Sequence, residues 1–221
     1  MLIQVDKPDD YFSQRNNLIK PMSACNVTSF SCFLQISGWL SRLPIPAGTQ
    51  PEDWLMNFFQ SQEAKDKLHQ VDPSGEIGTD QPNEVHAVLC WGINLLLQRY
   101  AGAQGDVVKF GTQWNAAQDF VASLQDNRPV VLSGRYPCYS ARANDIITIG
   151  HVTCLVGVEL DDNTNQPIRW IVDDPYGDVH TNYQNDSGRD ISLTAAEFTK
   201  WVQSVGSPNQ KWGHMCLQKG F

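Results

Sequence analysis

The chain has 221 residues, a formal net charge of -8 at pH 7 and a sequence pI of about 5.0. Hydrophobic residues make up 41% of it, with seven Trp and nine Phe, which is enough to build a core and excludes a disordered chain. The acidic balance and the lack of a Lys/Arg cluster argue against nucleic acid as substrate or partner, because such a surface repels phosphate.

The amino terminus, MLIQVDKPDDYFSQ, lacks the basic segment and following apolar stretch of a secretory signal. No apolar run is long enough to span a bilayer, so we expect no membrane insertion. The expected location is the cytoplasm, unless lysis or non-classical export releases the protein. Reduced thiols are then expected at all six cysteines, Cys25, Cys32, Cys90, Cys138, Cys154 and Cys216.

Helical periodicity dominates the first half of the chain, after a polar and irregular segment that ends at Pro21. A long helix is predicted over residues 23–43, with Ser23 as its cap. Pro51 opens a second predicted helix over residues 52–70, and the segment 71–84, rich in Pro, Gly and Asp, is predicted to be a loop. Two more helices are predicted over residues 83–100 and 113–125.

Strand-like segments dominate the second half, where runs rich in Val and Ile are bounded by turn residues. Strands are predicted over residues 128–136, 146–160, 167–177 and 211–220, with a hairpin turn at residues 161–167. A late helix is predicted over residues 192–203, with Ser192 as its cap. The layout is α+β: a helical half over about residues 1–127 faces an antiparallel sheet half over about residues 128–221, in one domain.

Cys25 is the first candidate for a catalytic residue, because it lies in the first turn of a predicted helix. Free N–H groups and the positive end of the helix dipole favour a thiolate there, and the thiolate is the reactive form of cysteine. Taken alone, Cys25 is better explained as a packed core residue that happens to start a helix. A role as nucleophile therefore depends on a base that faces it from elsewhere in the fold.

His151 and Asp174 are the candidates for that base and its partner. His151 follows Gly150 at the start of an apolar strand, and Asp174 ends the next strand, immediately before Pro175. A carboxylate there can hold the imidazole by its second nitrogen. Asp173 alternates to the opposite face of the strand, and we interpret it as a residue that shapes the turn.

Four strings, in the order FSQRNN, PMSACNVTSF, GHVTCLVGVE and IVDDPYGD, resemble the papain-like cysteine peptidases. They are most similar to the branch related to the bacteriocin-leader (double-glycine) processing peptidases. The resemblance implies a papain-like fold, in which a helical lobe carrying the nucleophile helix packs on an antiparallel sheet lobe. It also implies a Cys25–His151–Asp174 triad, with Gln14 as an oxyanion donor, and cleavage of peptide or isopeptide bonds without a metal.

Metal-binding alternatives are weaker. His86 and Cys90 are one helical turn apart, but zinc requires four ligands. His151 and Cys154 are an odd number of residues apart on a strand, so they point to opposite faces. The acid-rich hairpin at residues 161–165 could hold Ca²⁺, but it lacks the Gly and distal Glu of an EF-hand loop and is better interpreted as a turn. We expect no cofactor and no metal.

The expected substrate is a peptide or a peptidoglycan peptide, and a cell-wall lysin (endolysin) is one hypothesis. The segment from residue 52 to residue 83 looks like an insertion relative to the family, so substrate specificity does not transfer from the resemblance. Two alternatives stay open: a non-catalytic binding or inhibitory module with this fold, and an acyl-transfer enzyme such as a deamidase or transglutaminase. Nothing in the sequence indicates an oligomeric state.

Overall fold

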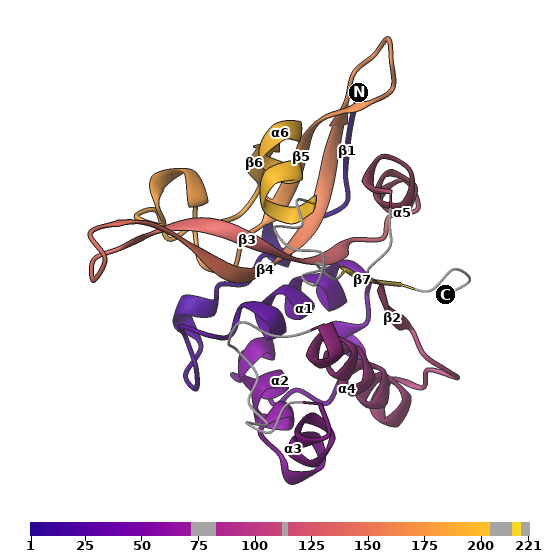
Figure 1. The fold of residues 1–221 in the computed structure, drawn as a ribbon. Coiled ribbons are helices and arrows are strands. Elements are labelled where there is room, and N and C mark those ends of the chain that lie inside the picture. Colours follow the sequence, from indigo (N-terminus) through magenta and orange to yellow (C-terminus); the bar gives the residue numbers. More distant parts are fainter. Residues whose placement is uncertain (72–82, 112–114, 204–213, 218–221) are drawn as a thin grey trace.

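The computed structural model describes residues 1–71, 83–111, 115–203 and 214–217, and it separates into a helical part and a sheet part (Figure 1). The predicted loop at residues 71–84 lies almost wholly outside the described residues, as do residues 113–114 of the fourth predicted helix and the ends of the last predicted strand. Helices and an antiparallel sheet together confirm the α+β class. No helix in the described ranges combines the length and apolar character needed to cross a membrane.

Six α-helices are present in the described residues: α1 Cys25–Ile36, α2 Pro51–Phe59, α3 Gln62–His69, α4 Asn83–Ala101, α5 Val121–Gln125 and α6 Ala195–Phe198. Turns of 3₁₀-helix are found at Pro8–Asp10, Gln14–Asn16, Leu40–Arg42 and Val179–Thr181. One π-helical turn, Ala116–Phe120, leads into α5, and another, Thr199–Gln203, follows α6.

One antiparallel sheet contains all seven described strands: β1 Leu2–Gln4, β2 Val108–Gly111, β3 Val130–Ser140, β4 Asp145–Leu160, β5 Pro167–Asp173, β6 Ile191–Thr194 and β7 His214–Leu217. Their order is β2-β7-β3-β4-β5-β6, and β1 pairs with β4. The register places His151 opposite Gly134 and Cys154 opposite Asp173. The sequence did not predict β1 or β2, both of which lie in the first half of the chain.

The first predicted helix is shorter than expected. It ends at Ile36 because Gly38 adopts a positive φ of 72°, and the Trp39 N–H then donates to the Leu34 carbonyl, which closes the helix end. The prediction of Ser23 as its cap is wrong. Ala24 occupies that position without a side-chain hydrogen bond, and the Ser23 N–H donates to the Lys20 carbonyl in the turn before it.

Capping side chains explain two further differences. The predicted helix over residues 52–70 is divided into α2 and α3, because the Ser61 hydroxyl accepts the Ala64 N–H and starts a new helix. The late helix begins at Ala195, where Thr194 and Glu197 form a capping box. The predicted cap, Ser192, lies within β6 instead.

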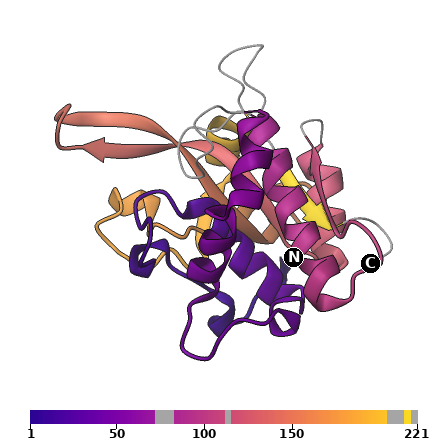
Figure 2. The same ribbon diagram turned by 90° about the horizontal axis from the view of Figure 1, so that it is seen from below.

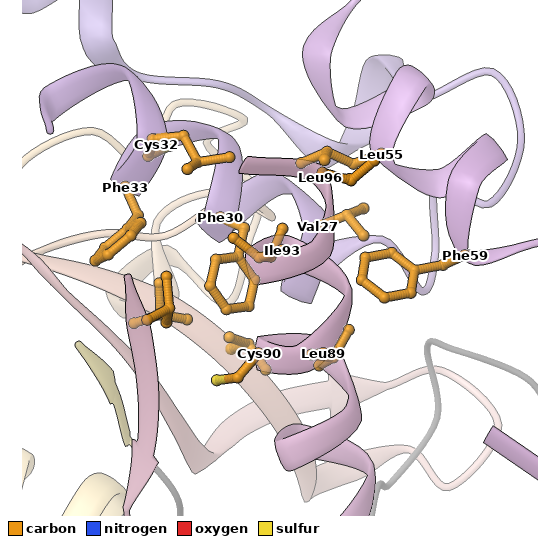
Figure 3. Close-up of a cluster of buried hydrophobic side chains, with 14 of the residues drawn as sticks. Val27, Phe30, Cys32, Phe33, Leu55, Phe59, Leu89, Cys90, Ile93 and Leu96 are labelled. Atoms are coloured by element: carbon orange, nitrogen blue, oxygen red, sulfur yellow. The ribbon is translucent and has the colours of Figure 1, made fainter. Parts of the chain in front are cut away.

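Two hydrophobic clusters hold the fold together. In the first, side chains of α1 interlock with those of α2 and α4, and Val27, Phe30, Phe59, Leu89 and Ile93 lie at its centre (Figure 3). In the second, the sheet packs on α5 and α6, and the rings of Trp170 and Phe198 stack 4.6 Å apart. Because α1 contributes to the first cluster and also packs on β3 and β4, its start is fixed against the sheet.

The paired ends of β3 and β4 form an arm that projects from the body of the molecule (Figure 2). Apolar side chains remain exposed on it, including Tyr139 at 48% and Ile146 at 50%. His151 lies at the base of this arm, where β4 enters the body of the sheet.

Candidate active site

The Cys25 thiol is half-buried at the first residue of α1, as the sequence predicted. The first N–H groups of a helix have no partner within it, so this position offers positive potential to a thiolate. One turn later, the Ser29 hydroxyl donates to the Val152 carbonyl over 2.9 Å. This bond attaches the start of α1 to the strand residue that follows His151.

His151 and Asp174 meet in the interior. The His151 Nε2 and Asp174 Oδ1 atoms are 2.6 Å apart, and the two residues are 5% and 0% exposed. The Tyr176 N–H donates to the same Oδ1 over 2.9 Å, and the Tyr183 hydroxyl lies 3.4 Å from Oδ2. Asp174 is therefore a fixed acceptor that orients the imidazole ring.

The second ring nitrogen of His151 is the one available to interact with the Cys25 thiol. Burial disfavours the charged ring, but the charge and hydrogen bond of Asp174, together with a hydrogen bond to Cys25, raise the pKa of His151 to about 10. Since Nε2 is directed at Asp174, we infer that Nδ1 faces Cys25. The raised pKa favours the protonated ring, and an imidazolium is the kind of neighbour that can stabilise a cysteine thiolate.

Gln14 lies between the two halves of the site. It begins a 3₁₀ turn, and its side chain is 2% exposed. Its Nε2 donates to the Pro21 carbonyl, ahead of Cys25, and its backbone N–H donates to the Pro175 carbonyl, next to Asp174; both distances are 2.8 Å. The amide has a second N–H, and the role of oxyanion donor stays a prediction.

Arg15 connects the same segment to the loop that follows Asp174, a role that the sequence reasoning missed. Its Nε donates to the Tyr176 carbonyl and its Nη2 to the Tyr183 carbonyl, each over 2.6 Å. Its Nη1 pairs with Asp186 at 2.9 Å, and the guanidinium lies over the Tyr176 ring. The only sequence signal was its place beside Gln14 in the string FSQRNN.

A second set of bonds holds the backbone of Asp174, and the sequence reasoning missed this set as well. The Tyr11 hydroxyl donates to the Asp174 carbonyl and accepts the Gly188 N–H, each over 3.1 Å. The Asp174 N–H donates to the Gly188 carbonyl over 2.8 Å. A Cβ at Gly188 would lie 1.9 Å from the Asp174 carbonyl oxygen, so this contact requires glycine.

Aromatic rings enclose the His–Asp pair. The rings of Tyr136 and His151 are nearly perpendicular at 5.3 Å, and Tyr183 makes a similar edge contact at 6.1 Å. Neither tyrosine was predicted, because their positions near His151 follow from strand pairing and from a loop. Excluding water here strengthens the electrostatic interaction between His151 and Asp174.

The other candidate residues lie elsewhere. Asp173 accepts the Asp190 N–H through Oδ1 over 3.1 Å. Burial lowers the pKa of His86 to about 4. Asp161 accepts bonds from Asn163 and Thr164 within its own turn.

One group of acidic residues has the spacing of metal ligands. Among the described residues, only Asp6, Asp173 and Asp190 form a group of three potential ligands close enough for one metal ion, and it includes none of the His–Cys pairs considered above. None of the five cysteines whose side chains are described takes part in a disulfide.

A thiol at the start of a buried helix, facing a His–Asp pair on an antiparallel sheet, is the arrangement of a papain-like cysteine peptidase. Residues 9–209 match the model of the Peptidase_C39 like family, so the chain belongs to that family. Membership confirms the resemblance found in the sequence and supports cysteine peptidase activity in general.

Comparison with solved structures gives a much more distant likeness. The crystal structure of PepW from Lactobacillus rhamnosis HN001 is 12% identical, with a TM-score of 0.28. The match covers 45% of this chain and 25% of that one, so this chain spans a quarter of the length of PepW. The comparison with curated proteins finds no match.

Proposed function

We propose that the protein hydrolyses peptide or isopeptide bonds through a Cys25–His151–Asp174 triad, assisted by Gln14. The observation that carries the proposal is the 2.6 Å contact between His151 Nε2 and Asp174 Oδ1, together with the position of Cys25 at the first residue of α1. Family membership supports the same chemistry.

The reaction begins with Cys25 as thiolate and His151 as imidazolium. The sulfur attacks the carbonyl carbon of the scissile amide, an S–C bond forms, and the carbonyl electron pair moves to oxygen. The Cys25 N–H and the free Gln14 N–H are the proposed donors to that oxyanion. His151 then gives its proton to the leaving nitrogen as the C–N bond breaks, which leaves a thioester on Cys25.

Water then hydrolyses the thioester on Cys25. His151, now neutral, takes a proton from the water that attacks the thioester, the acid product leaves, and the thiolate and imidazolium are restored. Asp174 keeps its charge throughout, and it holds the ring and stabilises the imidazolium. If an amine replaced water as acceptor, the same residues would perform acyl transfer, and mass spectrometry with and without added amine distinguishes the two.

The test compares the wild type with Cys25→Ala, and with Cys138→Ala as a matched control, because Cys138 is another half-buried thiol. We expect Cys25→Ala to abolish hydrolysis and rapid alkylation by iodoacetamide at pH 6, and Cys138→Ala to retain both. If Cys25 reacts no faster than a model thiol at pH 6, the proposed activation is wrong.

Two classes of natural substrate fit the proposed chemistry. One is a peptidoglycan stem or cross-bridge peptide, and the other is a protein. The two are separated by assaying purified cell walls from diverse bacteria beside unfolded protein substrates. Release of new amino termini from cell walls, dependent on Cys25, supports the peptidoglycan class. Cleavage of proteins alone excludes it.

A further inference from the structure

Three carboxylates from distant parts of the sequence converge beside the sheet. Asp6 follows β1, Asp173 is the last residue of β5, and Asp190 immediately precedes β6. Each provides an oxygen that lies within 4.8 Å of the corresponding oxygens of the other two. Asp173 neighbours Asp174 in sequence, but alternation along the strand directs the two side chains to opposite sides.

Asp173 is the buried member of the group, and one of its two carboxylate oxygens lacks a partner. Its residue exposure is 0%, and although Oδ1 accepts the Asp190 N–H, Oδ2 has no hydrogen-bond partner. A buried carboxylate oxygen without a partner is costly, and here the side chain is directed at two further carboxylates. A cation between the three groups would give this oxygen the partner that it lacks.

The surrounding side chains supply only part of that charge. Arg189 Nε lies 3.0 Å from Asp190 Oδ2, and the Gln4 amide donates to Asp6 Oδ1 over 3.0 Å and to Asp190 Oδ1 over 2.7 Å. Among the described residues that contact the group, one guanidinium faces three carboxylates, which leaves two negative charges when all are ionised. A divalent cation matches that remainder. Burial raises the pKa of Asp173 to about 8, so a bound cation would have to displace its proton.

We propose that Asp6, Asp173 and Asp190 form a site for Ca²⁺. Calcium takes oxygen ligands at about 2.3–2.6 Å in flexible geometry, and oxygens up to 4.8 Å apart can contact one such ion. Zinc is disfavoured because the group offers neither imidazole nor thiolate. Three carboxylates at a partly exposed site correspond to a Kd of roughly 10⁻⁵–10⁻³ M.

The bound ion would connect the segment after β1 to the paired ends of β5 and β6. It would fix the loop from Gly188 to Asp190, and Gly188 in turn holds the backbone of Asp174. The expected consequence is a more stable fold. Because this readout does not depend on catalysis, the site can be tested whether or not the proposed function holds.

The test measures Ca²⁺ binding by calorimetry and the Tm of chelator-treated protein with and without CaCl₂. For the wild type we expect one binding event and a Tm rise of about 5 °C or more at 100 times the Kd. Asp173→Asn keeps an oxygen acceptor for the Asp190 N–H, so it should be at least as stable as wild type in chelator while losing the calcium response. Asp190→Asn should lose the response as well.

Asp66→Asn is the matched control, because Asp66 is an exposed acid on α3, in the helical part of the molecule (Figure 1). It should keep the full response. If Asp173→Asn does not fold, Asp190→Asn and Asp6→Asn carry the test. No binding heat and a Tm change below about 1 °C in the wild type would overturn the proposal, as would an unchanged response in the Asp190 variant.

Discussion

His151 Nε2 and Asp174 Oδ1 lie 2.6 Å apart in the interior, and this contact determines which proton states the site can adopt. The carboxylate charge counts among the causes that raise the pKa of His151 to about 10. Replacing it tests the triad directly. Asp174→Asn keeps the shape but removes the charge, so we expect the pKa of His151 to fall and kcat to drop roughly 10²–10⁴-fold.

The measurement for Asp174→Asn is the pH dependence of kcat/KM, with the ring followed by NMR. The control is Asp178→Asn in the loop that follows, where the carboxylate accepts the His180 N–H rather than contacting His151. An unchanged His151 titration in Asp174→Asn would contradict the assigned contact.

Tyr183 positions the other oxygen of the same carboxylate, with its hydroxyl 3.4 Å from Asp174 Oδ2. Tyr183→Phe removes that donor and leaves the negative charge of Asp174 less compensated, so the pKa of His151 should rise further while kcat falls several-fold. Tyr176→Phe is the matched control, since its hydroxyl contacts Met22 instead. A titration of His151 that matches wild type would assign Tyr183 a packing role alone.

Gln14→Ala tests the oxyanion donor. A donor of this type contributes about 2.7–4 kcal/mol to the transition state, so kcat should fall about 10²–10³-fold with a smaller change in KM. Because Gln14 is buried and bonded to Pro21, the variant must be checked by its Tm. A loss of activity that follows loss of folded protein at the assay temperature would point to a structural role.

Gly188→Ala tests the contact that holds the Asp174 backbone. The added Cβ would lie 1.9 Å from the Asp174 carbonyl oxygen, so the loop must move, at a cost of about 2 kcal/mol or more. Gly48→Ala is the control: it meets no atom within 4 Å, and its positive φ of 81° costs roughly 1 kcal/mol. Urea unfolding and kcat together should show Gly188→Ala losing activity, and Gly48→Ala retaining it.

Glu52 is fully buried at the start of α2, and we expect it to make the free energy of unfolding depend on pH. Burial raises its pKa from 4.5 to about 7. The folded state therefore holds a proton that the unfolded state releases, so this contribution is full below pH 4.5 and is lost as pH rises through 7. Glu52→Gln should remove a decline of a few kcal/mol over that window, measured as the free energy of unfolding in urea.

Many of the helices and strands could be predicted from the sequence because local patterns of residues specify them. The period of α4 and the Val- and Ile-rich runs of β3, β4 and β5 predicted these elements close to their observed positions. Cap positions were harder to predict. Ser23 fits the sequence rule but Ala24, which does not fit it, occupies the cap, and Ser192 fits the rule as well as Thr194, which is the observed cap. Only the backbone conformation, as at Gly38, determines where a helix ends.

The sequence by itself determined the kind of residue at each candidate position: a thiol at a helix start, a histidine on a strand after a glycine, and an aspartate at a strand end. The residue types and their neighbours in the sequence were enough to show a resemblance to a known family. The tertiary structure decided what surrounds them, including Arg15, Tyr183 and Gly188. It also brought Gln4 and Asp190 into contact across 186 positions of sequence. A strand as short as β1 has too few residues to show a periodic pattern of hydrophobic residues. Contacts between distant segments depend on how the strands pair, so local sequence patterns do not predict them.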